Sequence, residues 1–255
     1  MAPRVPANFH VNGSDLYLLE KWNHDSQLPD AEQGLEILHA YRQLGYAERW
    51  KYEQRARDQQ IKTDAHLPEG DQNLLARARP WADERNACAP IWLRTCYAPG
   101  TDEAFSAIFK TFETNPPPHD WLAPKHDVVF DDANRFDFGS DWQRIFSRIP
   151  ILLSIWHTTP EDYQAKKKAG LKQSLEDEQY EMQEVEDAGD SWSEDGPYWP
   201  SLYTPYHYAC QTGVIFVADE ETLTAQTPEE GKFLVAWYDP NGNVVRYNRL
   251  VGHLA

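Results

Sequence analysis

The sequence predicts an α/β protein with a mixed, largely parallel sheet flanked by helices. Two short apolar runs, Gly213–Ala218 and Lys232–Tyr238, are rich in β-branched and aromatic residues, which is typical of strands buried on both faces. After residue 90 such runs alternate with stretches of helical spacing, which indicates strands and helices of one sheet-centred domain. Residues 239–243 carry a Pro and an Asn-Gly pair, so they predict the turn of a C-terminal antiparallel β-hairpin with a return strand near an edge.

Residues 1–89 are expected to form a helical N-terminal extension, and residues 90–255 the α/β domain. A helix is predicted from Asp30, with Gly45 as its C-terminal stop, and a second, charged helix from Tyr46 to Lys62. Residues 16–19 fit one buried turn or a short strand, and a short helix precedes Pro80.

The α/β domain is expected to open with strands at 91–95, 127–130 and 151–156. Helices that begin at Thr101 and Asp141 separate these strands, and prolines end both helices because the residue before a proline disfavours helical backbone angles. The carboxyl ends of these parallel strands are expected at one edge of the sheet.

The longest predicted helix begins at Pro160, with Thr159 as its N-cap, and runs to about Asp187. Its four lysines lie between residues 166 and 172, and seven acids follow between residues 176 and 187. Acids at a helix C-terminus oppose the macrodipole, so this end is expected to fray unless a basic group meets it. A narrow apolar stripe comprises Leu171, Leu175, Met182 and Val185. Residues 189–208, rich in aromatics and prolines, are predicted to be a long linker, so that the acidic helix and aromatic loop together span residues 160–210.

Composition narrows the classes of function. The 255 residues carry a formal net charge of −17, which disfavours binding to nucleic acid or to an anionic membrane and favours a basic partner. The three cysteines and the lack of a signal-peptide pattern at the first residues predict a cytoplasmic or nuclear protein. No phosphate loop or dinucleotide motif occurs, so no cofactor is expected.

Three segments, residues 91–95, 101–112 and 215–219, resemble in their layout an uncharacterised microbial family that is known only as a domain of unknown function. The resemblance implies a domain boundary near Pro90. It implies no activity, substrate or site.

The sequence leaves two classes of function open, an enzyme and a binding protein. The first is an enzyme of unassigned class, whose pocket would lie at the carboxyl ends of the strands and use Asp131, Asp132, His157 and Asp219 for acid–base work or divalent-metal binding. The structural interpretation is that an Asp after a strand forms a turn or caps a helix, and it is the commoner one. A zinc site at His207 and Cys210 is a remote possibility, because the paired spacing of a strong zinc motif is missing.

The leading hypothesis is a binding protein that docks a basic protein surface. An acidic run without Lys or Arg, residues 176–195, adjoins a stretch rich in Trp and Tyr, and aromatics inside an acidic field are suitable interface anchors. A solvated helix face is the plainer alternative. The candidate binding residues are Glu184, Glu186, Asp187, Trp192, Tyr198 and Trp199.

Overall fold

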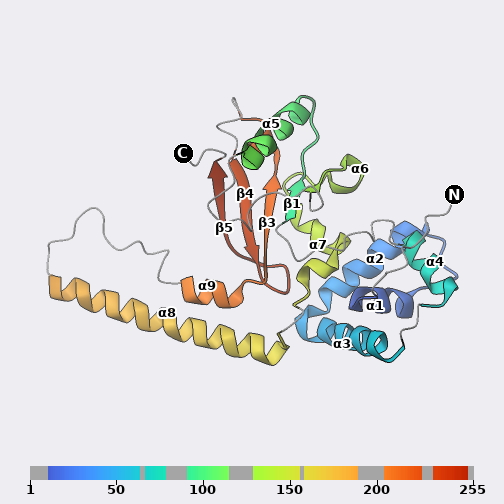
Figure 1. The fold of residues 1–255 in the computed structure, drawn as a ribbon, viewed down its shortest axis with the longest axis horizontal. Coiled ribbons are helices and arrows are strands. Elements are labelled where there is room, and N and C mark those ends of the chain that lie inside the picture. The colour runs from blue at the N-terminus through green and yellow to red at the C-terminus, as the bar shows by residue number, and fades with distance from the viewer. Residues whose placement is uncertain are drawn as a thin grey trace.

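A computed structural model describes residues 11–63, 67–78, 91–114, 129–155, 158–188, 204–225 and 232–251. Within these residues the protein is mixed α/β, with one five-stranded sheet in the order β2-β1-β3-β4-β5 (Figure 1). The strands are β1 (Ile91–Arg94), β2 (Val129–Phe130), β3 (Gly213–Ala218), β4 (Lys232–Tyr238) and β5 (Val244–Val251). The helices are α1 (Gly13–Lys21), α2 (Asp30–Gln43), α3 (Gly45–Thr63), α4 (Glu69–Ala78), α5 (Thr101–Thr114), α6 (Ala133–Phe136), η3 (Trp142–Arg144), α7 (Ile145–Arg148), η4 (Pro150–Leu153), α8 (Pro160–Ala188), α9 (Thr204–Cys210) and α10 (Glu220–Leu223).

The sheet is evenly mixed rather than largely parallel. Strand β1 pairs in parallel with β2 and β3, whereas β3 pairs antiparallel with β4, and β4 antiparallel with β5. Strands β2 and β5 are the two edge strands of this sheet, and Arg249 of β5 lies opposite Leu234. Because β1, β2 and β3 are parallel, their carboxyl ends lie at the same end of the sheet.

Both faces of the sheet are covered, which explains the continuous apolar runs. On β1, Ile91 and Leu93 face a core shared with the N-terminal helices, α7 and η4, while Trp92 faces a second core against α5 and α10. Trp92 stacks on Phe216 of β3, with ring centroids 4.4 Å apart and an interplanar angle of 8°. Helices from both ends of the chain thus enclose a single sheet.

Two expected elements differ from the structure. The apolar run 151–156 was predicted as a strand, but residues 150–153 form the 3₁₀ helix η4, which starts at Pro150 and buries Leu152 and Leu153 in the core with the N-terminal helices. A short apolar run is compatible with either element, and only its surroundings decide. The end of the predicted linker is also wrong, because α9 occupies residues 204–210 and packs against α8.

The N-terminal residues that fitted a turn or a strand belong to α1. Asn12 is its N-cap and accepts a hydrogen bond from the Asp15 backbone amide, and the Asp15 carboxylate accepts one from the Asn12 amide in return. This capping box begins a helix that buries Leu16, Tyr17 and Leu18. The break expected at Gly45 is confirmed, since Gly45 has a φ of 75° between α2 and α3.

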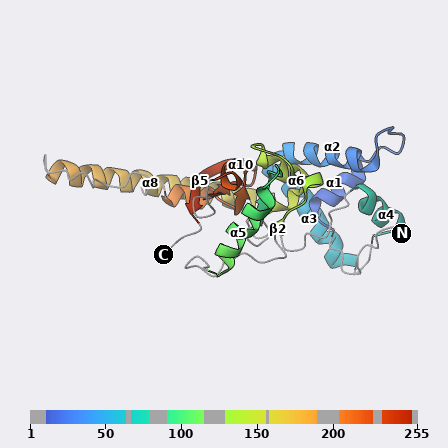
Figure 2. The same cartoon turned by 90° about the horizontal axis from the view of Figure 1, so that it is seen from above.

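Helix α8 extends beyond the rest of the described chain. Figure 1 shows it leaving the side of the body with α9 beside its first half, and Figure 2 shows the same projection from a perpendicular direction. The predicted cap is confirmed, because Thr159 Oγ1 accepts a hydrogen bond of 3.0 Å from the Asp162 amide. None of the described helices is long and apolar enough to cross a membrane.

The turn between β4 and β5 joins the sheet to the helical layer. Asn241 Oδ1 accepts a hydrogen bond of 2.9 Å from the Tyr46 amide, and Arg49 donates to the Pro240 carbonyl. Gly242 has a φ of 79°, and a Cβ at this position would lie 2.9 Å from Cδ2 of Phe146. Glycine is required here for its backbone angle and for the space it leaves.

Comparison of two glycine substitutions tests this requirement. We expect Gly100→Ala, at a φ of 87° with open space around it, to lower the free energy of unfolding by about 1 kcal/mol through backbone strain alone. Gly242→Ala should cost about 2 kcal/mol more, because its methyl group also overpacks against Phe146. Urea unfolding of both variants provides the measurement, and equal losses would show that the turn does not pack against α7 as described.

Candidate functional site

The predicted carboxylates that the structure describes follow β2 and β3 at the same end of the sheet. Each of the three caps a helix or pairs with an arginine. Asp132 is the N-cap of α6, accepting from the Asn134 amide at 3.0 Å, and it pairs with Arg135 at 3.2 Å. Asp131 contacts Arg94 of β1, with 3.4 Å between Oδ1 and Nη1. The fourth candidate, His157, lies outside the described residues, and the segment before it is a 3₁₀ helix rather than a strand.

Arg94, the last residue of β1, connects the end of this strand to the start of α5. Its side chain is only 4% exposed, and Nε donates to the Cys96 carbonyl at 3.0 Å. Nη2 donates to Thr101 Oγ1 at 2.8 Å and to Asp102 Oδ1 at 2.5 Å, at the first turn of α5. A buried guanidinium with all these partners positions the strand end and the helix start relative to each other.

Tyr97 completes this corner. The Arg94 guanidinium carbon lies 4.5 Å from the centroid of its ring. Burial and the nearby Asp131 carboxylate raise the pKa of the Tyr97 hydroxyl, so it remains protonated at neutral pH.

Asp219 is the N-cap of α10 and forms a bidentate ion pair. Its Oδ1 accepts from the Thr222 amide at 3.0 Å, and Arg249 of β5 donates to Oδ2 at 2.6 Å and to Oδ1 at 3.0 Å. Burial alone would raise the pKa of Asp219, but the hydrogen bonds from Arg249 and Thr222 lower it below its ordinary value. A carboxylate held in this way is a weak base, and no hydrogen bond or ion pair of the described residues joins it to Asp131 or Asp132.

The pair His207 and Cys210 lies on α9. Cys210 is buried, and its carbonyl accepts a hydrogen bond of 3.0 Å from the Tyr163 hydroxyl of α8. Burial and the charge of Arg246 lower the pKa of His207, and the same arginine would repel a cation. Among the residues with described positions, no three His, Cys, Asp or Glu side chains are arranged to hold a metal ion.

A further buried polar cluster, not expected from the sequence, lies among the N-terminal helices. Glu53 Oε1 accepts hydrogen bonds from Tyr41 at 3.1 Å and from Ser154 at 3.0 Å. Burial raises the pKa of Glu53, although these hydrogen bonds and one from the Gly13 amide oppose the rise. Tyr46, Arg49, Glu53 and Ala56 follow helical spacing and are buried on one side of α3, but two of the four are charged, so the sequence carried no apolar pattern that would reveal this face.

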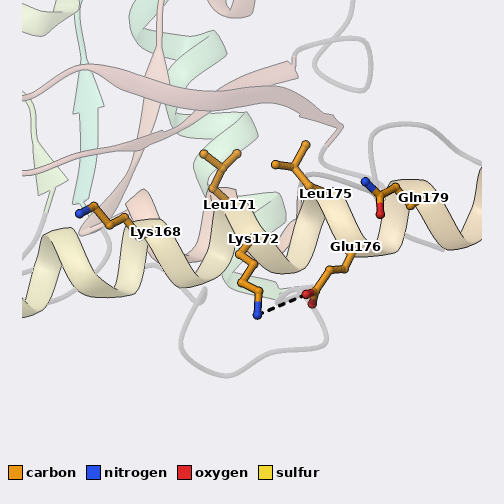
Figure 3. A pocket seen from close by; sticks show the side chains of 6 residues that line it. All are labelled: Lys168, Leu171, Lys172, Leu175, Glu176 and Gln179. Carbon is orange, nitrogen blue, oxygen red and sulfur yellow. Dashed lines mark ion pairs between the residues drawn. The ribbon is translucent and has the colours of Figure 1, made fainter.

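The exposed surface that stands out is on α8. A shallow groove runs along it, lined by Lys168, Leu171, Lys172, Leu175, Glu176 and Gln179 (Figure 3). Leu171 and Leu175 are 41% and 44% exposed, and in Figure 3 both point to one side while the Lys172–Glu176 ion pair lies on the other. Exposed leucines beside charged groups on a projecting helix are suited to helix docking.

The other side of α8 is fixed to the body. A Cβ on Gly170 would lie 2.7 Å from the Pro205 carbonyl oxygen, so α9 approaches α8 closely at this glycine. Ser174 Oγ accepts from the Tyr206 amide at 3.2 Å, and the Tyr163 ring packs edge-on against Tyr46 of α3. The groove therefore lies on a helix whose orientation is set by two neighbours.

The structure does not test the binding residues predicted from sequence. Glu184, Glu186 and Asp187 occupy the last turns of α8, where only the backbone is described. Trp192, Tyr198 and Trp199 lie outside the described residues.

No protein-family model, curated protein or solved structure matches this chain.

Substitutions at the sheet edge test the structural role of Arg94. We expect Arg94→Met to lower the free energy of unfolding by about 2 kcal/mol, because the buried Cys96 carbonyl and Thr101 hydroxyl lose their donor. Asp131→Asn should cost less than about 1 kcal/mol, since its contact with Arg94 is long and partly exposed. Chemical denaturation measures both, and a neutral Arg94→Met would contradict this role.

The raised pKa of Glu53 predicts how stability depends on pH. The native state binds this proton more tightly than the unfolded state, so the contribution of Glu53 rises as pH falls from above its folded pKa towards the ordinary value of 4.5. The unfolding free energy of the wild type minus that of Glu53→Gln should therefore increase as pH is lowered over this window. Glu48→Gln, on the exposed side of the same helix, is the control for removing one carboxylate.

Proposed function

We propose that the protein is a binding protein and that the exposed side of α8 is its docking surface, for a partner that presents basic groups beside apolar ones. The observation that carries this proposal is the projection of α8 from the body with Leu171 and Leu175 exposed along it. The seven acids between residues 176 and 187 would supply the charge that attracts the partner. The apolar groups would supply the affinity, since exposed ion pairs contribute little by themselves.

The acidic and aromatic residues beyond the groove extend this surface in the proposal. Glu184, Glu186 and Asp187 would continue the acidic field, and Trp192, Tyr198 and Trp199 would act as anchors. The net charge of −17 supports a protein partner rather than nucleic acid, and a cytoplasmic or nuclear location remains a prediction.

The alternative enzyme has less support. Its three described carboxylates are used as helix caps or arginine partners, so each already has a structural role. In the same proposal, residues 1–89 are a helical extension that the α/β domain of residues 90–255 needs, because Leu18, Leu38 and Leu75 cover one face of its sheet.

A synthetic amphipathic helical peptide, with lysines along one side and leucines along the other, tests the docking surface. We expect the full chain to bind this peptide, with an affinity that falls as salt is raised. Replacing Glu181, Glu184, Glu186 and Asp187 by their amides should weaken binding about tenfold or more, measured by fluorescence anisotropy. Deletion of residues 186–197 should likewise abolish capture while circular dichroism shows an intact fold.

The matched control neutralises four exposed acids elsewhere, namely Glu32, Glu36, Glu69 and Glu103. This variant has the same change in net charge, so it should bind the peptide nearly as well as the wild type. Equal weakening in the two variants would mean that only the overall charge attracts the peptide, and the proposed docking surface would be wrong.

A further inference from the structure

We propose that the partner of α8 is a second copy of this chain, with the two α8 helices paired antiparallel about their midpoints. This inference rests on the proposed function, because it uses the same groove and names its occupant. The groove is lined, in chain order, by Lys168, Leu171, Lys172, Leu175, Glu176 and Gln179, so both lysines precede the acidic and polar residues, and the leucines lie near its middle. A two-fold axis at the apolar centre places the basic end of each copy on the acidic end of the other.

The central turns of the helix have the same order of charge, whereas the first turn carries the acids Glu161 and Asp162. Its lysines occupy residues 166–172 and its later acids residues 176–187, and the midpoint of Pro160–Ala188 lies at Ser174. An axis near Ser174 brings Leu171 and Leu175 of one copy against the same leucines of the other, and Lys172 opposite Glu176. A parallel pair would instead set lysines against lysines and acids against acids, which is unfavourable.

The groups involved are available for a second copy. The Lys172–Glu176 pair within one helix is 3.3 Å long, with side chains 78% and 53% exposed, so exchanging partners costs little. With the axis near Ser174, the lysines at residues 166–172 of the second copy would lie opposite residues 176–182, which include Glu176, Asp177, Glu178 and Glu181. Helix α9 covers a different side of α8, because it contacts Gly170 and Ser174, and neither of these residues lines the groove.

Charge reversal in the groove provides the test, with the oligomeric state of the full chain measured by analytical ultracentrifugation. We expect the wild type to form dimers as its concentration is raised. Lys168→Glu with Lys172→Glu should weaken dimerisation about tenfold or more, and so should Glu176→Lys with Gln179→Lys, because each makes both halves of the groove alike in charge. A mixture of these two double variants should form heterodimers, and the chain with all four substitutions should dimerise again.

The double variant Lys51→Glu with Arg77→Glu is the matched control, because both side chains are exposed on the N-terminal helices α3 and α4 rather than on α8. It changes the net charge in the same direction as the lysine substitutions in the groove but should leave dimerisation nearly unchanged. Recovery in the mixture and in the fourfold variant also excludes misfolding as the cause of the losses.

The outcomes separate this inference from the proposed function. A wild type that stays monomeric, or dimers that are indifferent to all groove substitutions, would overturn the pairing of α8. If the lysine–leucine peptide still binds a monomeric chain through the acidic residues, the docking surface stands and only its occupant is wrong. Loss of both activities would remove the proposed function as well.

Discussion

The burial of both faces of the sheet is the constraint on which the rest of the structure depends. Strands β1 and β3 present large apolar side chains in both directions, so each face needs its own cover. The N-terminal helices with α7 and η4 cover one face, and α5 with α10 cover the other. These elements form the body, whereas α8 projects from it and packs mainly against α9, and for this reason we propose α8 as the docking surface.

The sequence predicted those strands correctly whose two faces are both buried. Gly213–Ala218 and Lys232–Tyr238 are apolar on both sides, and they are strands because both sides meet a core. The run beginning at Ile151 is just as apolar, yet it is a 3₁₀ helix, because its position after Pro150 and against the N-terminal helices decides its shape. Helix α9 begins with Thr204–Pro205, the same helix-start pattern as Thr159–Pro160 at α8. It was not predicted, because the surrounding aromatic and proline residues are typical of a loop.

The site was only partly predictable, because its chemistry depends on pairs distant in sequence. The parallel strands do bring the residues after β1, β2 and β3 to one edge, as the alternation of elements indicated. The arginines that engage the carboxylates there were not predictable, since Arg94 and Asp131 are 37 residues apart, and Arg249 and Asp219 are 30. Glu53 belongs to a helix that was predicted only as charged, and its partner Ser154 comes from a segment 101 residues away.

The length of α8 also determines how far apart two such molecules would hold their bodies. Its 29 residues span about 43 Å at ~1.5 Å per residue, and the body lies beside the half that begins at Pro160. Two helices that run in opposite directions leave one body at each end of the assembly. Physiological salt screens exposed charges over about 8 Å, so close contacts between the helices would persist while the repulsion between more distant charges of the two anionic bodies is weakened. In the proposed dimer, the contacts would thus be confined to one long helix of each copy, although the protein as a whole is strongly anionic.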